Sequence, residues 1–150
     1  MLRDLLLGTA TTSLCLILQS IALITALRFY AQRESQVRAT FLRAEKVVIG
    51  LVIILIFGCL AQITIWALMF YALDEFDSFE PAFYHSAVNF ATLGYGDVVM
   101  SDKHRLLGPL EAINGALMLG ISTAALARAF TTVIRGQVNS DCRQDSPPSR

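Results

Sequence analysis

The stretch Thr92-Leu93-Gly94-Tyr95-Gly96-Asp97 decides how this chain folds, because it places closely spaced glycines between two long apolar segments. It lies between two long apolar segments, residues 47–73 and 106–127, and an apolar, aromatic run leads into it. Glycine reaches positive φ at no steric cost, so these glycines let successive carbonyls turn to one side of an extended chain. Such a backbone differs from an ordinary β-strand.

The composition is that of a membrane protein. Hydrophobic residues make up 55% of the 150-residue chain and charged residues only 16%, whereas soluble domains carry about 25% charged residues. A membrane-spanning helix needs about 20 apolar residues, and residues 5–27, 47–73 and 106–127 each satisfy this length. The first is longer than the apolar part of a signal peptide, so we expect it to remain as a helix. The sequence thus predicts an all-α membrane protein with three transmembrane helices.

Charged residues between the spans indicate the orientation. Basic residues dominate the linker at residues 28–46 and the tail after residue 127, whereas acidic residues gather at positions 74–80. Because basic loops stay on the cytoplasmic side, we expect an inner (plasma) membrane protein with its linker and C-terminus in the cytoplasm and its N-terminus outside. The linker is either an amphipathic helix on the membrane surface or a helical extension of the neighbouring spans. The zero net charge implies no nucleic-acid partner.

The sequence contains no pattern that indicates catalysis. The three cysteines, Cys15, Cys59 and Cys142, have no metal-binding or redox spacing and are interpreted as free thiols. No span contains a plausible nucleophile–base pair, so we predict neither an enzyme nor a cofactor. Residues 136–150 are polar and cannot bury enough apolar surface to fold alone, which predicts a disordered cytoplasmic tail.

A short helix is expected before the glycine-rich stretch. Pro81 suits the first position of a helix, and Glu80 suits the positive N-terminal end of the helix dipole. Residues 82–91 are too few to cross a bilayer, so this helix and the irregular strand after it must be buried in protein or line water. The order of span, short helix, glycine-rich strand and span, from residue 47 to about residue 133, resembles the re-entrant pore loop of the potassium-channel family.

The resemblance implies a selectivity filter, in which backbone carbonyls replace the hydration shell of K⁺. The carbonyls would come from Thr92, Leu93, Gly94 and Tyr95. The hydroxyl of Thr92 would be a further K⁺ ligand, Gly96 would complete the turn, and Asp97 would stand at the outer mouth. Because one chain supplies one filter strand and a ring of carbonyls needs four, the resemblance implies a homotetramer in a lipid membrane. K⁺ would be the permeating ion, with no other cofactor.

Several positions depart from the family's pattern. Leu93 stands where Val or Ile is usual, which changes the packing of the strand but keeps its carbonyl. Tyr84 and His85 replace an aromatic belt of tryptophans, and Val88 replaces a glutamate that some members pair with the aspartate of the filter. Asp97 is therefore expected to bond Tyr84, His85 or water. His85 itself is either a packed neutral ring or a pH sensor.

The third span resembles the pore-lining inner helix of that family. Gly115 stands at the position of the gating hinge. Glycine inside a helix costs about 1 kcal/mol relative to alanine, so it indicates either a bend or close helix packing. One helical stripe would face either the cavity below the filter or a neighbouring subunit, with Leu119 as the constriction. This stripe consists of Ala116, Leu119, Thr123 and Ala127.

Glu111 is the one acidic residue within the third span. An ionisable residue inside a membrane is costly and marks a functional hypothesis, so Glu111 is a candidate pH sensor or a modulator of K⁺ in the pore. The alternative is a structural role, in which a neutral carboxyl bonds Ser86, Asn89 or Asn114. His104 precedes this span and is expected in solvent.

We therefore expect an N-terminal transmembrane helix (1–27), a basic cytoplasmic linker (28–46), a pore module (47–135) and a tail (136–150). The expected function is a tetrameric, potassium-selective channel that conducts K⁺ passively. Two alternatives stay open: a non-conducting regulatory membrane subunit, and a weakly selective cation channel, which Leu93 permits. Small residues of the first helix, among them Gly8, favour its packing outside the pore module. No feature of the sequence specifies a gating stimulus.

Overall fold

The computed structural model describes the backbone of residues 1–32 and 41–144, and the side chains of residues 1–32 and 45–134. Its elements are the helices α1 (Leu2–Gln32), α3 (Phe41–Ala72), α4 (Phe79–Phe90) and α5 (Leu107–Gln144). The three long helices contain segments that are long and apolar enough to cross a membrane: Leu2–Gln32, Glu45–Ala72 and Leu107–Ile134. The prediction of an all-α membrane protein with three spans and a short re-entrant helix is confirmed.

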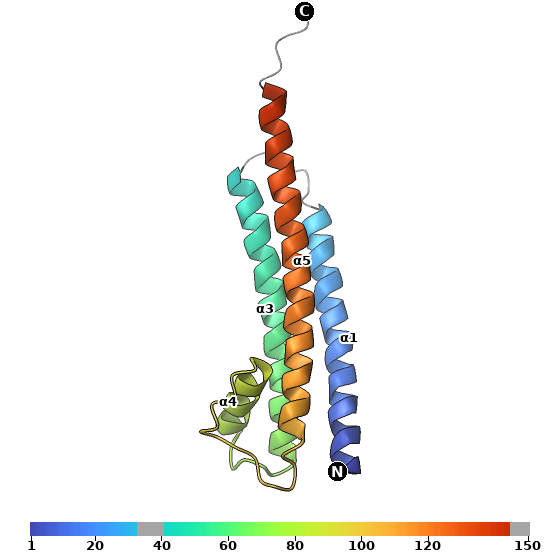
Figure 1. The fold of residues 1–150 in the computed structure, drawn as a ribbon, viewed down its shortest axis with the longest axis vertical. Coiled ribbons are helices and arrows are strands. Elements are labelled where there is room, and N and C mark those ends of the chain that lie inside the picture. Colours follow the sequence, from blue (N-terminus) through green and yellow to red (C-terminus); the bar gives the residue numbers. More distant parts are fainter. Residues whose placement is uncertain (33–40, 145–150) are drawn as a thin grey trace, which may run out of the picture.

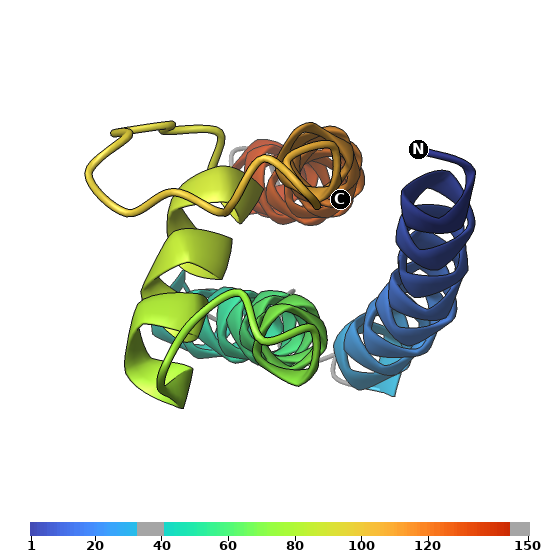
Figure 2. The same ribbon diagram turned by 90° about the horizontal axis from the view of Figure 1, so that it is seen from below.

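The long helices form an antiparallel bundle, in which α1 and α5 run in one direction and α3 runs in the other (Figure 1). The short helix α4 packs across α3 and α5 at one end of the bundle, and α1 contacts the same two helices from the opposite side (Figure 2). The N-terminus lies at the end where α4 and the glycine-rich loop are found. This agrees with the prediction that the N-terminus and the loop share one side of the membrane.

The helix ends differ from the predicted boundaries. α1 continues to Gln32 and α3 begins at Phe41, so both ends of the linker are helical extensions of the spans, while residues 33–40 lie outside the described residues. α5 passes residue 135 and reaches Gln144. A single glycine at position 136 is tolerated in a helix at a cost of about 1 kcal/mol, and proline first returns at position 147. Residues 145–150 lie outside the described residues.

α4 begins two residues earlier than expected. Its N-cap is Ser78, in an extended conformation, and its first turn contains Glu80 and Pro81. Proline in a first turn displaces no intrahelical hydrogen bond, and the carboxylate lies near the positive end of the helix dipole. The two residues therefore act at the helix start as predicted.

All four helices contribute to the core around Trp66 and Phe70 of α3. Fully buried neighbours are Cys15 of α1, Ala82 of α4 and Leu107 of α5. Cys15 and Cys59 are free thiols, as predicted, and the side chain of Cys142 lies outside the described residues. α1 is thus an integral wall of the bundle.

A buried polar chain joins α1 to both of its neighbours. Gln62 of α3 donates from Nε2 to Gln19 Oε1 (2.8 Å), and Gln19 donates from Nε2 to Ser122 Oγ of α5 (2.8 Å). Polar bonds between helices compensate buried polar groups where no water competes for them. Glycine also brings α1 close, since a Cβ on Gly8 would lie 2.6 Å from Leu110 Cδ1. The predicted close packing of the first helix is confirmed.

Gly115 permits a close contact between α5 and α4. A Cβ at this position would lie 2.0 Å from the carbonyl oxygen of Phe90, whereas a Cβ on Gly120 would meet nothing within 4 Å. α5 runs through Gly115 without interruption. Of the two predicted roles, close packing is the one that this structure contains.

The substitution Gly115→Ala is expected to destabilise the protein strongly. Overpacking costs roughly 1–3 kcal/mol, and the obstacle here is a backbone carbonyl that cannot rotate away as a side chain does. The unfolding temperature in detergent measures the effect. Gly120→Ala in the same helix is the matched control and should leave the unfolding temperature unchanged or raised. A Gly115→Ala variant as stable as the wild type would contradict the packing role.

Candidate functional site

The backbone of the glycine-rich loop alternates between two conformations. Thr92, Gly94 and Gly96 have positive φ values of 58°, 58° and 74°, whereas Leu93 and Tyr95 do not. Alternation of this kind turns successive carbonyls toward the same side of the chain. No described residue donates a backbone hydrogen bond to the carbonyls of residues 92–96. The loop thus presents a row of unpaired carbonyl oxygens, as the glycines predicted.

The positive φ of Thr92 was not predicted, and it has a local cause. Thr92 donates from its backbone N to Asn89 O (2.8 Å), and Leu93 donates to Val88 O (2.9 Å). This pair of bonds is the Schellman motif that ends many helices, and it requires a left-handed residue at the position of Thr92, where glycine is usual. Threonine in this region is strained by roughly 1–2 kcal/mol. The end of α4 therefore sets the conformation in which the loop begins.

The far end of the loop is fastened to the same helix. Tyr84 of α4 donates from its hydroxyl to Asp97 Oδ2 (2.6 Å), and the backbone N of Val98 donates to Asp97 Oδ1 (3.0 Å). The bond from Tyr84 is the main reason that the pKa of Asp97 is lowered, and the same bond raises the pKa of Tyr84. Of the predicted partners of Asp97, the structure selects Tyr84.

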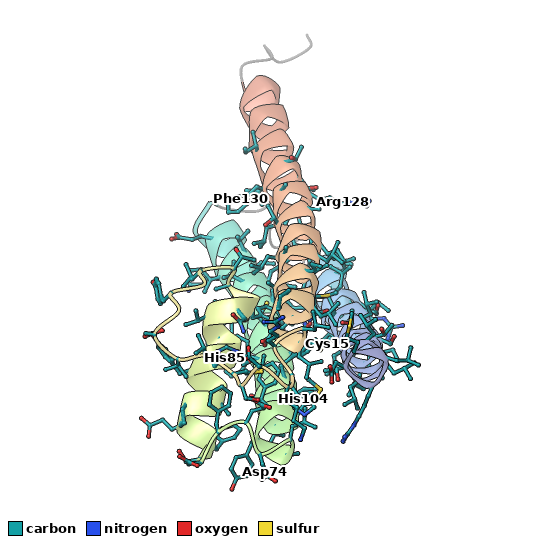
Figure 3. The ribbon with its side chains drawn as sticks, turned by 60° about the horizontal axis from the view of Figure 1, so that its bottom comes forward. Cys15, Asp74, His85, His104, Arg128 and Phe130 are labelled. Atoms are coloured by element: carbon teal, nitrogen blue, oxygen red, sulfur yellow. The ribbon has the colours of Figure 1, made fainter. Side chains whose placement is uncertain are left out.

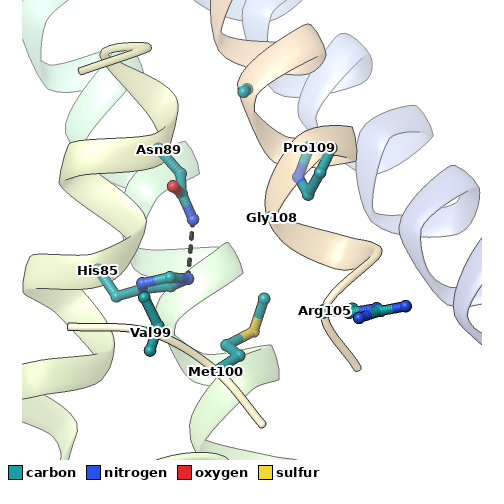
Figure 4. A pocket seen from close by; sticks show the side chains of 8 residues that line it. His85, Asn89, Val99, Met100, Arg105, Gly108 and Pro109 are labelled. Carbon is teal, nitrogen blue, oxygen red and sulfur yellow. Dashed lines mark hydrogen bonds between the residues drawn. The ribbon is translucent and has the colours of Figure 1, made fainter. Parts of the chain in front are cut away.

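His85 holds the chain just beyond Asp97. Its Nδ1 lies 2.8 Å from Val98 O, and its Nε2 lies 2.8 Å from Asn89 Nδ2. His85 and Asn89 both line a pocket of about 360 Å³ (Figure 4). Because a carbonyl can only accept, Nδ1 carries the proton and Nε2 accepts from the amide. Burial lowers the pKa of His85. These contacts match the predicted packed neutral ring.

The remaining surface of the loop has no covering within the described chain. The side chains of Leu93 and Tyr95 are 54% and 65% exposed, and Cβ atoms built on Gly94 and Gly96 would meet nothing within 4 Å. The side chain of Tyr95 has no hydrogen-bond partner among the residues that the structure describes. The loop is therefore supported from the α4 side and open on the other.

The predicted stripe on α5 is also uncovered. Its members, Ala116, Leu119, Thr123 and Ala127, are all exposed, whereas Met118 and Ser122 on the opposite face are buried. Residues three or four positions apart share one face of a helix, so the stripe and the buried pair lie on different faces of α5. The stripe is therefore left uncovered by the rest of the described chain, as both predicted roles require.

Glu111 lies apart from that stripe. Its side chain is fully buried, and its Oε1 lies 2.5 Å from Ser86 Oγ of α4. Of the three predicted partners, Ser86 makes this hydrogen bond, and Asn89 also faces the carboxyl. The carboxyl therefore lies against the side of the short helix that packs on α3 and α5.

The expectation that His104 lies in solvent is wrong. It is only 2% exposed, and its Nδ1 lies 2.9 Å from Asp4 Oδ1 near the start of α1. Figure 3 locates His104 at the same end of the molecule as His85, far from Phe130 of α5. No local pattern links positions 4 and 104, because the pairing exists only once α1 packs beside the loop.

Acidification is expected to destabilise the protein through His85. Its pKa in the folded state lies below its ordinary value of 6.5, so the unfolded chain binds the proton more readily. The stabilising contribution is complete above about pH 6.5 and is lost as the pH falls through the lowered pKa. Unfolding temperatures of wild type and His85→Gln between pH 7 and 5 (roughly the range of histidine titration) measure this. Identical pH dependence in both would contradict the assignment.

The comparison with protein families agrees with this geometry. Residues 47–132, more than half of the chain, match the model of a family described as ion channel. The match covers α4, the carbonyl-lined loop and the membrane spans on either side of them. No curated protein and no solved structure matches the chain. The chain belongs to the ion-channel family built on the two-helix pore module of the potassium-channel type, and α1 precedes the matched module.

Proposed function

We propose that this protein is a potassium-selective channel that conducts K⁺ passively through a homotetramer. One observation carries the proposal: positive φ at Thr92, Gly94 and Gly96 orients a row of unpaired carbonyls to one side. Carbonyl oxygens in such a row replace the hydration shell of an alkali cation. K⁺ would be bound by the carbonyls of Thr92, Leu93, Gly94 and Tyr95.

The direction of α4 supports a cation at this position. The C-terminal end of a helix carries a partial negative charge, and α4 ends directly at the first carbonyl of the row. The acidic Asp97 stands at the other end of the loop. The local field therefore favours a cation over an anion along the whole row.

The uncovered surfaces support assembly from four copies. Leu93, Tyr95 and the α5 stripe are exposed in the single chain, although they are apolar or aromatic in the main. Further copies around a common axis would cover these residues and close the carbonyls into a ring. The stripe would then line the cavity beneath the ring, with Leu119 as its narrowest point.

The membrane and the orientation belong to the same proposal. The chain is a multi-pass membrane protein, and its N-terminus and carbonyl row share one end of the bundle. The C-terminal ends of α1 and α5 and the start of α3 lie at the other end of the bundle. The linker and the tail that follow these helix ends are rich in basic residues, and basic segments stay in the cytoplasm. The filter would accordingly face the outside of the plasma (inner) membrane.

K⁺ flux through liposomes that contain only this protein tests the function. We expect flux that Ba²⁺ blocks and that Gly96→Asp abolishes, because an aspartate at positive φ strains the backbone and fills the carbonyl row. Gly120→Ala is the control variant and should conduct. A folded tetramer without flux would favour the regulatory-subunit alternative, and equal flux of Na⁺ and K⁺ would favour a weakly selective channel.

Tyr84→Phe is expected to weaken the support of the filter without unfolding the protein. The variant removes the donor to Asp97 Oδ2 but keeps the aromatic ring and the bond from Val98. We expect a several-fold faster decline of K⁺ current during sustained conduction in planar bilayers. Tyr71→Phe, at an exposed tyrosine of α3, is the matched control and should decline at the wild-type rate. Equal rates in all three proteins would rule out this role of Tyr84.

A further inference from the structure

The buried carboxyl of Glu111 is not part of the carbonyl row, and its protonation state depends on the groups around it. Glu111 is fully buried within a membrane-spanning segment. Among the described residues, no lysine, arginine or histidine forms an ion pair with it. An unpaired carboxylate at membrane depth is costly, so the contacts around the group must decide whether it carries a proton.

The two contacts of the Ser86 hydroxyl indicate which protonation state of Glu111 they require. Ser86 Oγ lies 2.8 Å from the backbone carbonyl oxygen of Ile63 in α3 and 2.5 Å from Glu111 Oε1 in α5. A hydroxyl has one proton to donate, and a backbone carbonyl can only accept. Both contacts are hydrogen bonds only if Ser86 donates to Ile63 O and accepts a proton from Glu111 Oε1. An ionised Glu111 would leave one of the two oxygen pairs without a proton between them.

The second carboxyl oxygen points to the same conclusion. Glu111 Oε2 is buried and has no hydrogen-bond partner among the described residues. An ionised carboxylate offers about four acceptor sites, and leaving a buried charge uncompensated is strongly destabilising. A protonated carboxyl leaves only a neutral carbonyl oxygen unpaired, which costs far less.

We infer that Glu111 is a proton-binding site, and that its proton completes a hydrogen-bonded chain from α5 through Ser86 to the backbone of α3. The ligand is a single proton, held on Oε1 at neutral pH. Because Ser86 belongs to α4, these hydrogen bonds fix the short helix to both α3 and α5. Loss of the proton at alkaline pH places a negative charge in this site and breaks the chain. The folded protein would bind this proton whether or not it conducts ions.

Among the described groups that face Glu111, the thiol of Cys15 is the one other group that could contribute to the expected pH response. Cys15 of α1 lies near Glu111, and Asn89 of α4 also faces the carboxyl. Trp66 Nε1 of α3 and the side-chain amide of Asn114 in α5 are buried without hydrogen-bond partners among the described residues. His85 of α4 is bonded to Val98 and Asn89 instead. Cys15→Ala is therefore needed to separate the thiol from the carboxyl.

Infrared spectroscopy of the full chain in lipid membranes tests the inference, because a protonated carboxyl has a C=O stretching band that a carboxylate lacks. We expect such a band in the wild type at neutral pH, its loss as the pH is raised, and its absence in Glu111→Gln. The side-chain amide that this substitution introduces can still donate to Ser86 Oγ, so the variant should fold. Glu80→Gln, at an exposed glutamate of α4, is the matched control and should keep the band.

A second measurement follows the consequence for stability. The unfolding temperature of the wild type and of Cys15→Ala should fall as the pH is raised, whereas that of Glu111→Gln should stay flat. If Glu111→Gln fails to fold, ¹³C-labelling of glutamate carboxyls in the wild type identifies the band by its isotope shift. A wild-type spectrum with no protonated glutamate at neutral pH would overturn the inference, whether or not the protein conducts K⁺.

Discussion

The loop of carbonyls can exist only if the chain leaves α4 in a left-handed conformation, and this constraint organises the pore module. The last carbonyls of α4 accept hydrogen bonds from the backbone of Thr92 and Leu93, which forces Thr92 to a φ of 58°. The far end of the loop is tied back to Tyr84 of the same helix through Asp97. A single short helix thus holds both ends of the loop, and the conformation between them follows from the alternation that Thr92 begins.

Because α4 holds the loop, whatever holds α4 determines how precisely the carbonyls are positioned. α5 approaches so closely that only glycine fits at position 115 against the Phe90 carbonyl. One turn earlier in α5, the carboxyl of Glu111 contacts Ser86 of α4, and the same hydroxyl contacts the backbone of α3. Steric contact fixes the distance between the helices, and directional hydrogen bonds fix the rotation of α4 about its axis.

α1 lies outside the matched pore module, and it is joined to that module by polar contacts at two depths. At mid-depth, Gln19 bridges Gln62 and Ser122. Near the end of the bundle that contains the loop, Asp4 meets His104. Apolar packing alone gives little preference for one rotation of a helix in lipid, whereas hydrogen bonds to buried polar partners favour one rotation. The added helix therefore has a defined position against the pore module.

The sequence alone determined the three spans, the short helix and the position of the loop, because apolar length and glycine spacing are local properties of the chain. It also restricted the partners of Asp97 and Glu111 to a few candidates. The tertiary structure chose Tyr84 and Ser86 among them, revealed the left-handed Thr92, and buried His104 against Asp4. It also assigned Gly115 to close packing. These features depend on which helix faces meet, and contacts between residues as distant as positions 4 and 104 leave no periodic signal in the sequence.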